Sequence, residues 1–416
     1  MTGKLLLLGL TALVISTYAS TPQPVPMYTF ACTGNAFERT GTCSNGGRPD
    51  SLLQGTDGIF YGTAQVSNEG TSTPTGGTIF SLTAAGTFTL LHRFSPGVNK
   101  NYPNGNLPGN LAEGSDGKLY GTTLYGGVGG CNGYCGSGVL YRINKDGTGF
   151  QILHRFCSVT NCTDGGEGAV VAAPDGNLYG ASFSGGTGNC GIYYIGCGTI
   201  YKVTPSTGKY EVVVNFDQST TGAFPTNLAL ASDGTFYGLN FGTTSNNLFQ
   251  FIPTTATLKT NPVSFPFVNG LPARAGAVIQ GPNGNFYGLY TVYGESGAGV
   301  YEVQPDGTNL QLFPFYTTVP GFPTGLIVAS DGNFWMADYN GTSDYGDIIQ
   351  LSPVDGSLMQ RLSPFGVKAP AGAFTAMIIQ AKSGLLWGTT GEYGKVASGQ
   401  FGDGTVFKFN VGLPPR

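Results

Sequence analysis

The chain has 416 residues, and 40% of them are hydrophobic, which is enough to build one closed core. Only 10% of the residues are charged and the net charge is −4, so there is no basic stripe for nucleic acid or for an anionic membrane surface. No stretch after the first twenty residues is long and apolar enough to cross a membrane. We therefore expect one domain over residues 21–416 that binds neither nucleic acid nor membranes.

Residues 1–20 are typical of a secretory signal peptide. Lys4 precedes an apolar run from Leu5 to Ile15, and small residues follow near position 20. The run is short for a bilayer core, which argues against a membrane anchor. The prediction is a protein that is secreted or lies in the lumen of the secretory pathway.

A six-residue pattern then occurs seven times, and its third copy reads Asp175-Gly176-Asn177-Leu178-Tyr179-Gly180. An Asp-Gly or Asn-Gly pair between two apolar runs indicates a tight hairpin turn. Neighbouring copies lie 48 to 59 residues apart, which is in the range of propeller blades. The turn glycines are Gly58, Gly117, Gly176, Gly234, Gly284, Gly332 and Gly384.

Each copy is long enough for four short strands, so we predict an all-β, seven-bladed β-propeller. The seventh copy ends after its third strand, at residues 405–409. The segment Pro26–Phe30 is similar to the fourth strands of other copies, such as Leu90–Phe94. We expect this N-terminal strand to complete the last blade, close the ring and leave no long free edge.

Eight cysteines lie in four close pairs, each inside one expected loop, and an even number in an exported chain favours disulfides. The predicted pairs are Cys32 with Cys43, Cys131 with Cys135, Cys157 with Cys162, and Cys190 with Cys197. Zinc binding is the alternative, but the spacings are irregular for a thiolate site. We expect no bound metal.

Two N-glycosylation sequons occur, at Asn161 and Asn340. They are short patterns that gain weight from the export signal.

One face of the propeller should carry the binding site, because it receives the long, varied loops after the second strands together with the segments between copies, and these hold all eight cysteines. Ten residues before each turn glycine, the chain reaches this mouth of the central channel with Arg48, Leu107, Gly166, Phe224, Arg274, Phe322 and Phe374. Just after the second strands stand Tyr125, Tyr293, Tyr339 and Tyr393. The pattern predicts an aromatic pocket with cationic donors. The alternative is that these side chains only pack between blades.

The sequence offers little acid–base chemistry. His92 and His154 occupy the same position of two copies, which favours a structural role and leaves no base for a serine triad. Carboxylates near the mouth are Asp50, Glu167, Asp217, Glu295, Asp338 and Glu392, and no spacing selects a pair among them. We expect no cofactor. A binding module fits, as does an enzyme that mainly orients its substrates, for example for a cycloaddition.

The six-residue unit, together with Gly198–Pro205 and Leu91–Phe94, resembles the GloVer-type tandem repeat of secreted and cell-surface proteins over nearly all of residues 24–410. That resemblance implies the architecture and not the function. The layout of export signal, seven repeats and cysteine-pinned loops also resembles the fungal propeller hetero-Diels–Alderases of tropolone sesquiterpenoid biosynthesis. This second resemblance implies that a tropolone quinone methide is joined to a humulene-type olefin without a cofactor.

In that interpretation, Arg48 or Arg274 would donate to the oxygen on which negative charge develops. Phe224, Phe322, Phe374 and the four tyrosines would shape the cavity for the apolar substrate. The main alternative is a carbohydrate-active propeller, either a glycan-binding module or a polysaccharide lyase. A third is a structural or adhesion protein that binds a protein partner through its loops.

Overall fold

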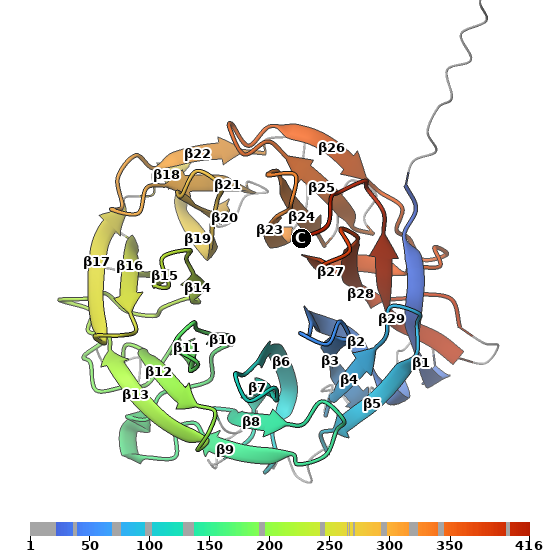
Figure 1. Cartoon of the computed structure of the whole chain (residues 1–416), viewed down its shortest axis with the longest axis horizontal. Coiled ribbons are helices and arrows are strands. Elements are labelled where there is room, and N and C mark those ends of the chain that lie inside the picture. The colour runs from blue at the N-terminus through green and yellow to red at the C-terminus, as the bar shows by residue number, and fades with distance from the viewer. Residues whose placement is uncertain are drawn as a thin grey trace, which may run out of the picture.

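The computed structural model describes residues 22–35, 40–68, 76–95, 102–127, 137–190, 196–241, 246–263, 265, 267–268, 271–292, 298–315, 323–339, 345–396 and 400–416. In these residues there are twenty-nine strands and one short 3-10 helix, η1 (Thr160–Cys162). The sheets follow one another around a ring in chain order, as Figure 1 shows. The described part of the chain is an all-β propeller. The expected signal peptide, residues 1–20, lies outside the described residues.

Five sheets are separate blades, and the strands of each blade are numbered from the channel outward. The first is β6 (Asn106–Glu113), β7 (Leu119–Tyr125), β8 (Val139–Ile143) and β9 (Gln151–Arg155). The second is β10 (Val170–Ala172), β11 (Leu178–Ser182), β12 (Thr199–Thr204) and β13 (Lys209–Asn215). The third is β14 (Ala229–Leu230), β15 (Phe236–Phe241), β16 (Asn246–Ile252) and β17 (Thr257–Val263). The fourth is β19 (Leu271–Gln280), β20 (Phe286–Val292), β21 (Ala298–Val303) and β22 (Gln311–Pro314), with a short extra strand, β18 (Phe267–Val268). The fifth is β23 (Pro323–Val328), β24 (Phe334–Asp338), β25 (Asp347–Leu351) and β26 (Leu358–Leu362).

The sixth sheet has eight strands and contains both ends of the chain. Its order is β27 (Ala373–Gln380), β28 (Leu386–Glu392), β29 (Gln400–Phe409), β1 (Val25–Asn35), β2 (Thr40–Gln54), β3 (Phe60–Asn68), β4 (Thr78–Leu82) and β5 (Phe88–Arg93).

This wide sheet differs from the predicted seven separate blades: hydrogen bonding gives five separate blades and one sheet that joins the first and last repeats. The reason is the length of β1, which was expected over Pro26–Phe30 and continues to Asn35. β1 pairs antiparallel with β29, from Val25 opposite Lys408 to Thr33 opposite Gln400. Its end, Thr33–Asn35, also pairs with the start of β2. One strand therefore connects the two ends of the repeat array.

The turn aspartate and the repeat tyrosine are linked by a hydrogen bond, which explains their fixed spacing. The phenol of Tyr61 donates to Asp57 at 2.8 Å, and that of Tyr179 donates to Asp175 at 2.8 Å. The same carboxylates accept the backbone N–H two residues further on. The aspartate thus stabilises the hairpin turn and satisfies a hydroxyl that is otherwise buried.

Neighbouring repeats pack through aromatic pairs. The ring of Tyr237 lies 4.0 Å from that of Phe286, and the ring of Tyr287 lies 4.6 Å from that of Phe334. In the eight-stranded sheet, Trp387 of the last repeat stacks on Phe60 of the first at 3.9 Å. In these repeats the tyrosine or tryptophan packs on the phenylalanine that opens the second strand of the next repeat, and leucine takes that place at Leu119, Leu178 and Leu386.

The glycine after the repeat tyrosine makes room for an aromatic side chain of the third strand. A Cβ on Gly180 would overlap the ring of Tyr201, and the same holds for Gly121 and Tyr141. In the fifth blade, Met336 replaces the glycine, and its register partner is Ile349 instead of an aromatic residue. The two positions vary together because they share one space in the blade interior.

We expect Gly180→Ala to destabilise the protein by about 1–3 kcal/mol, because the added methyl would push Tyr201 out of a packed position. Gly325→Ala in β23 is the matched control, since a Cβ there meets nothing within 4 Å. Urea unfolding of the two variants measures the difference. Equal losses of stability would show that the Tyr201 contact is not the reason for glycine.

Candidate functional site

Four of the seven aligned mouth positions share a left-handed backbone. The φ angle is 52° at Arg48, 56° at Leu107, 57° at Phe224 and 62° at Phe374. Non-glycine residues rarely adopt this conformation, and bulky ones least of all. The alignment by distance from the turn glycine therefore identified structurally equivalent residues.

Contacts between neighbouring repeats hold this backbone in place. The N–H of Leu107 donates to the Gly76 carbonyl at 3.0 Å, and the N–H of Phe374 donates to that of Tyr345 at 2.6 Å. A proline follows three of the four residues, and its ring lies against a left-handed glycine of the preceding repeat, as Pro108 does against Gly77. The scaffold thus fixes the backbone, and the side chain at each position is free to differ.

Three of the predicted aromatic residues come together between the fifth blade and the last repeat. Phe374 stacks on Tyr339 with ring centroids 4.9 Å apart. Tyr393 lies 6.2 Å from Phe374, and so does Tyr345 at 6.3 Å, a residue that sequence analysis missed. Each of these side chains is half-buried. They form an aromatic group on one side of the mouth.

Phe224 belongs to a different part of the mouth. It stacks on Phe183 at 4.9 Å, and Phe183 is 48% exposed. Sequence analysis missed Phe183, although it stands seven residues after its turn glycine, as Tyr339 does. That shared offset is the signal that could have found it.

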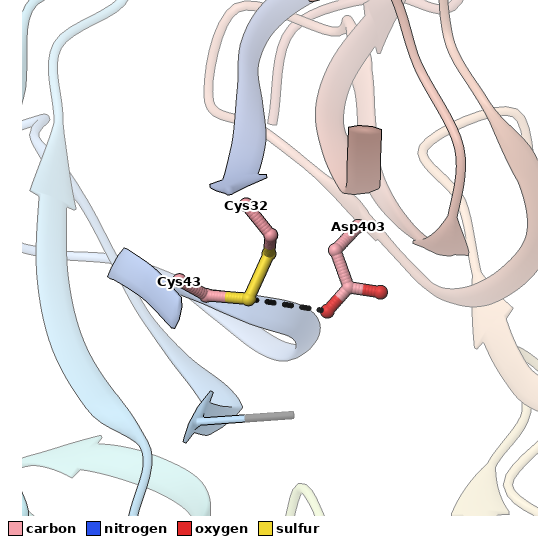
Figure 2. Close-up of side chains that lie close together, drawn as sticks. All are labelled: Cys32, Cys43 and Asp403. Atoms are coloured by element: carbon pink, nitrogen blue, oxygen red, sulfur yellow. Dashed lines mark hydrogen bonds between the residues drawn. A yellow bond between two sulfur atoms is a disulfide. The ribbon is translucent and has the colours of Figure 1, made fainter. Parts of the chain in front are cut away.

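Arg48 is paired with a buried acid. Its Nε lies 4.0 Å from Oδ1 of Asp403, which is fully buried, while the Arg48 side chain is 33% exposed. Figure 2 shows Asp403 beside the Cys32–Cys43 disulfide, with Oδ2 4.0 Å from Cys43 Sγ. A Cβ on Gly47 would overlap this carboxylate. The first role of the Arg48 guanidinium is to balance a buried charge.

The ligand atoms of Cys32, Cys43 and Asp403 lie within 4.8 Å of one another, a spacing that would suit a metal ion. The two sulfurs are bonded to each other, however, and a disulfide has no thiolate to offer a metal. In this form the three residues hold the start of β2 against β1 and β29.

A cavity of about 300 Å³, which we call the mouth pocket, opens between the first three repeats. Its apolar wall includes Leu107, Pro108 and Leu124, and Leu124 is 43% exposed. Its polar groups are Asp50, Gln65, Asn110, Thr122, Thr123 and Glu167. The aligned residue of the third repeat is Gly166, so no side chain from that position meets Leu124 in the way that Phe224 meets Phe183.

Burial changes the protonation of both acids in the mouth pocket. It raises the pKa of Glu167 to about 7. Burial also raises the pKa of Asp50, and a hydrogen bond from Gln65 partly opposes this. Since Glu167 is half neutral near pH 7, it can donate a hydrogen bond that an ionised carboxylate cannot.

The mouth pocket adjoins a channel pocket of about 550 Å³, since Asn110 and Ala169 line both. The channel pocket is lined by the innermost strands and is mainly apolar, with Leu52, Leu111 and Val170 in its wall.

Two of the other mouth carboxylates have structural roles. Asp338 is fully buried opposite Asp347, and Nε of Arg361 lies 3.7 Å from Oδ2 of Asp347. Asp217 accepts hydrogen bonds from Ser219 and from the N–H of Asn189, which lower its pKa and tie two loops together.

The two histidines pack between neighbouring repeats. His92 stacks on Phe150 at 3.8 Å, and burial lowers its pKa to about 4. His154 stacks on Tyr210 at 3.8 Å, and its Nε2 lies 3.1 Å from Asp164. Their equivalent surroundings in β5 and β9 agree with a structural role.

Several predicted residues remain untested. Tyr125 ends β7 and is half-buried. For Arg274, in β19, only the backbone is described, and Phe322, Tyr293, Glu295 and Asn340 lie outside the described residues. Asn161 is exposed within η1, as a glycosylation site must be.

Three of the four predicted disulfides are confirmed. They join Cys32 to Cys43, Cys157 to Cys162, and Cys190 to Cys197. Cys131 and Cys135 lie outside the described residues. Disulfides of this number are typical of oxidising compartments. Among the described helices, none has the length and hydropathy of a membrane span.

Comparison with known families supports the repeat interpretation in the first part of the chain. Residues 27–194 match the Gloeobacter/Verrucomicrobia repeat. This repeat covers the first three copies of the six-residue pattern and the N-terminal strand. The sequence matches no curated protein.

Solved propellers resemble the fold at low sequence identity. Virginiamycin B lyase from Staphylococcus aureus is 12% identical, with a TM-score of 0.54 over 88% of this chain and 96% of its own. Kuenenia stuttgartiensis hydrazine synthase is 11% identical, with a TM-score of 0.55 over 82% and 92% of the two chains. The extracellular domain of a hybrid two-component system from B. thetaiotaomicron is 12% identical, with a TM-score of 0.54 over 96% of this chain and 44% of its own. These likenesses establish the propeller fold.

Proposed function

We propose that this protein is a secreted, cofactor-free enzyme that binds a small, largely apolar substrate at the channel mouth and catalyses an intermolecular hetero-Diels–Alder reaction. The observation that carries the proposal is the mouth pocket, about 300 Å³, which adjoins the apolar channel pocket, about 550 Å³, at Asn110 and Ala169. Volumes of this size suit drug-sized ligands, and a few polar groups on an apolar wall suit orientation more than acid–base chemistry.

In this reaction a quinone methide supplies a C=C–C=O unit and the olefin supplies a C=C bond. One C–C and one C–O bond form while three π bonds become one, so no atom or proton leaves. Negative charge grows on the carbonyl oxygen, and a hydrogen-bond donor there lowers the barrier. The neutral carboxyl of Glu167 and the amide of Asn110 are donors in the mouth pocket.

The residues predicted from sequence have supporting roles in this proposal, as further candidate donors or as contacts at the rim. Arg48 and Arg274 remain candidate donors, although the pairing of Arg48 with Asp403 favours a structural role for it. Phe224 and the aromatic group of Tyr339, Phe374 and Tyr393 would hold the apolar olefin at the rim. Phe322, Tyr125 and Tyr293 are proposed for the same wall.

The test is incubation of the purified protein with a tropolone quinone methide, generated in situ, and humulene, with the adduct measured by chiral chromatography. Leu124→Trp should reduce enzymatic product about a hundredfold, because the indole fills the mouth pocket and displaces the substrate. Val354→Trp is the control, since Val354 lies on the opposite face and is 81% exposed. Unchanged product and stereoselectivity in Leu124→Trp would contradict the assigned site.

The two carboxyl groups in one pocket favour a second candidate, a carbohydrate-active enzyme or glycan-binding module. Asp50 and Glu167 have raised pKa values through burial, and a raised pKa is what a general acid needs. A panel of neutral and acidic oligosaccharides distinguishes the two candidates. Turnover of a glycan that is lost in Asp50→Asn or Glu167→Gln would replace the cycloaddition proposal.

We also infer that the eight-stranded sheet works as two blades, so that the ring has seven units and β1 closes it. The pairing of β1 with β29 and the stacking of Trp387 on Phe60 support this count. Export through the segment 1–20, with glycans on Asn161 and Asn340, is proposed from the sequence and from the three disulfides.

A further inference from the structure

A second cavity, of about 470 Å³, lies on the face opposite the mouth, between the fourth and fifth separate blades. We call it the turn pocket, because hairpin turns form its rim. Its walls include Pro282, Tyr287, Pro353 and Val354, and its two charged lining residues are Glu302 and Asp331. Among its described lining residues there is no lysine or arginine.

Glu302 is the unusual group in the turn pocket. It is only 8% exposed, and its three hydrogen bonds all reach one oxygen, Oε1. The donors are Nδ2 of Asn283 at 3.0 Å, Nδ2 of Asn285 at 2.6 Å and the Tyr287 phenol at 2.6 Å. Within the described structure no hydrogen bond reaches Oε2. Oε2 is reached by solvent on the side of the turn pocket, where a cation could pair with it.

The repeat supplies an internal comparison that shows what the partner should be. Glu302 is the register partner of the repeat tyrosine Tyr287. The same position is occupied by a cation in three other repeats, namely Arg142, Lys202 and Lys408. The other three repeats have the neutral residues Ser81, Gln250 and Gln350 there, so this is a position that holds a positive charge in three repeats and a negative charge only at Glu302.

The interface between the first and second separate blades is the closest match to the turn pocket. There, Nη1 of Arg142 donates to the Pro205 carbonyl at 3.1 Å, and the Tyr120 phenol lies 3.4 Å from the same oxygen. In the turn pocket, the Tyr287 phenol lies 3.5 Å from the equivalent carbonyl, that of Pro353. The tyrosine and the carbonyl are kept, and the guanidinium is replaced by Glu302.

Asp331 adds a second carboxylate on the other side of the same space. It belongs to the turn of the next blade and accepts hydrogen bonds from Asn333 and Gln350. Two carboxylates and a carbonyl, with proline, tyrosine and valine walls, match a planar cation with an apolar body.

We propose that the turn pocket binds a small organic cation with a guanidinium or amidinium head group. The head group donates to Glu302, Asp331 and the Pro353 carbonyl, in the place that the Arg142 guanidinium takes at the equivalent interface. This site is independent of the mouth pocket and of the reaction proposed there.

Isothermal titration with benzamidinium at low ionic strength tests the site, and neutral benzamide is the matched probe. We expect benzamidinium to bind with one-to-one stoichiometry and benzamide to bind at least about tenfold more weakly. Glu302→Gln keeps an oxygen for the three donors and removes the charge at Oε2, so it should weaken benzamidinium binding about tenfold or more. Val354→Trp, at an exposed position on the rim, should also block binding without affecting the fold.

Leu124→Trp, in the mouth pocket, is the control and should leave benzamidinium affinity unchanged. The proposal is overturned if benzamide binds as tightly as benzamidinium, or if Val354→Trp leaves the affinity unchanged. It is also overturned if a folded Glu302→Gln variant, checked by thermal melting, binds like the wild type. Failure of cycloaddition in the mouth pocket affects none of these outcomes.

Discussion

Deletion of residues 22–35, which removes β1, is expected to abolish cooperative folding. β1 supplies Phe30, which is fully buried, and Tyr28, which stacks on Phe88 at 3.9 Å. Truncation of one buried phenylalanine costs about 3–5 kcal/mol, and whole domains are stable by only about 5–15 kcal/mol. The deletion also exposes the unpaired edge of β29, so aggregation should follow. Thermal melting followed by circular dichroism measures the result.

Two controls separate the causes of this effect. A chain that begins at residue 22 should melt like the full-length protein. The double variant Cys32→Ser and Cys43→Ser keeps β1 and removes only its disulfide, so it should remain folded with reduced stability. A synthetic peptide of residues 22–35 should restore melting to the deleted chain. A deleted chain that melts within a few degrees of the control would show that β1 is dispensable for the ring.

Replacement of Glu167 by Gln is expected to stabilise the protein by ~1–3 kcal/mol at pH 8 and to have little effect near pH 4.5. Burial raises the pKa of Glu167 from its ordinary value of 4.5 to about 7 in the folded protein. Between these values the folded state keeps a proton that the unfolded state releases. The contribution of Glu167 to stability therefore falls as pH rises from about 4.5 to 7, and above pH 7 the penalty is constant.

The difference between wild type and Glu167→Gln isolates this effect from other titrations. His92 acts in the opposite sense, because burial lowers its pKa to about 4 and its contribution to stability rises with pH up to its ordinary pKa of 6.5. Asp50 acts in the same sense as Glu167. Among the described residues, ionisable groups near Glu167 include Asp50, in the same pocket, and Tyr201, whose pKa is raised by burial, by Tyr210 and by Glu167. Urea unfolding from pH 4.5 to 8 gives the curves, and a difference that does not change with pH would contradict the assignment.

The predicted site was recovered only in part. The position ten residues before each turn glycine correctly grouped Arg48, Leu107, Phe224 and Phe374. In a repeat protein, residues at the same distance from the turn lie at equivalent places around the ring. The same offset could not show that Arg48 faces Asp403, which lies 355 positions later in the chain. Nor could it show that a glycine at position 166 leaves a pocket beside Leu124.

The sequence by itself determined the propeller fold, its hairpin turns and the three described disulfides. These features depend on local spacing: a turn aspartate four residues before a tyrosine, a glycine that admits an aromatic ring, and cysteines within one loop. Only the tertiary structure decided which strands join the first and last repeats and which acids are buried together. It also decided that Glu302 takes the position that Arg142, Lys202 and Lys408 take in other repeats. Those properties depend on contacts between distant residues, and neither burial nor the charge of a neighbour across an interface can be read from spacing along the chain.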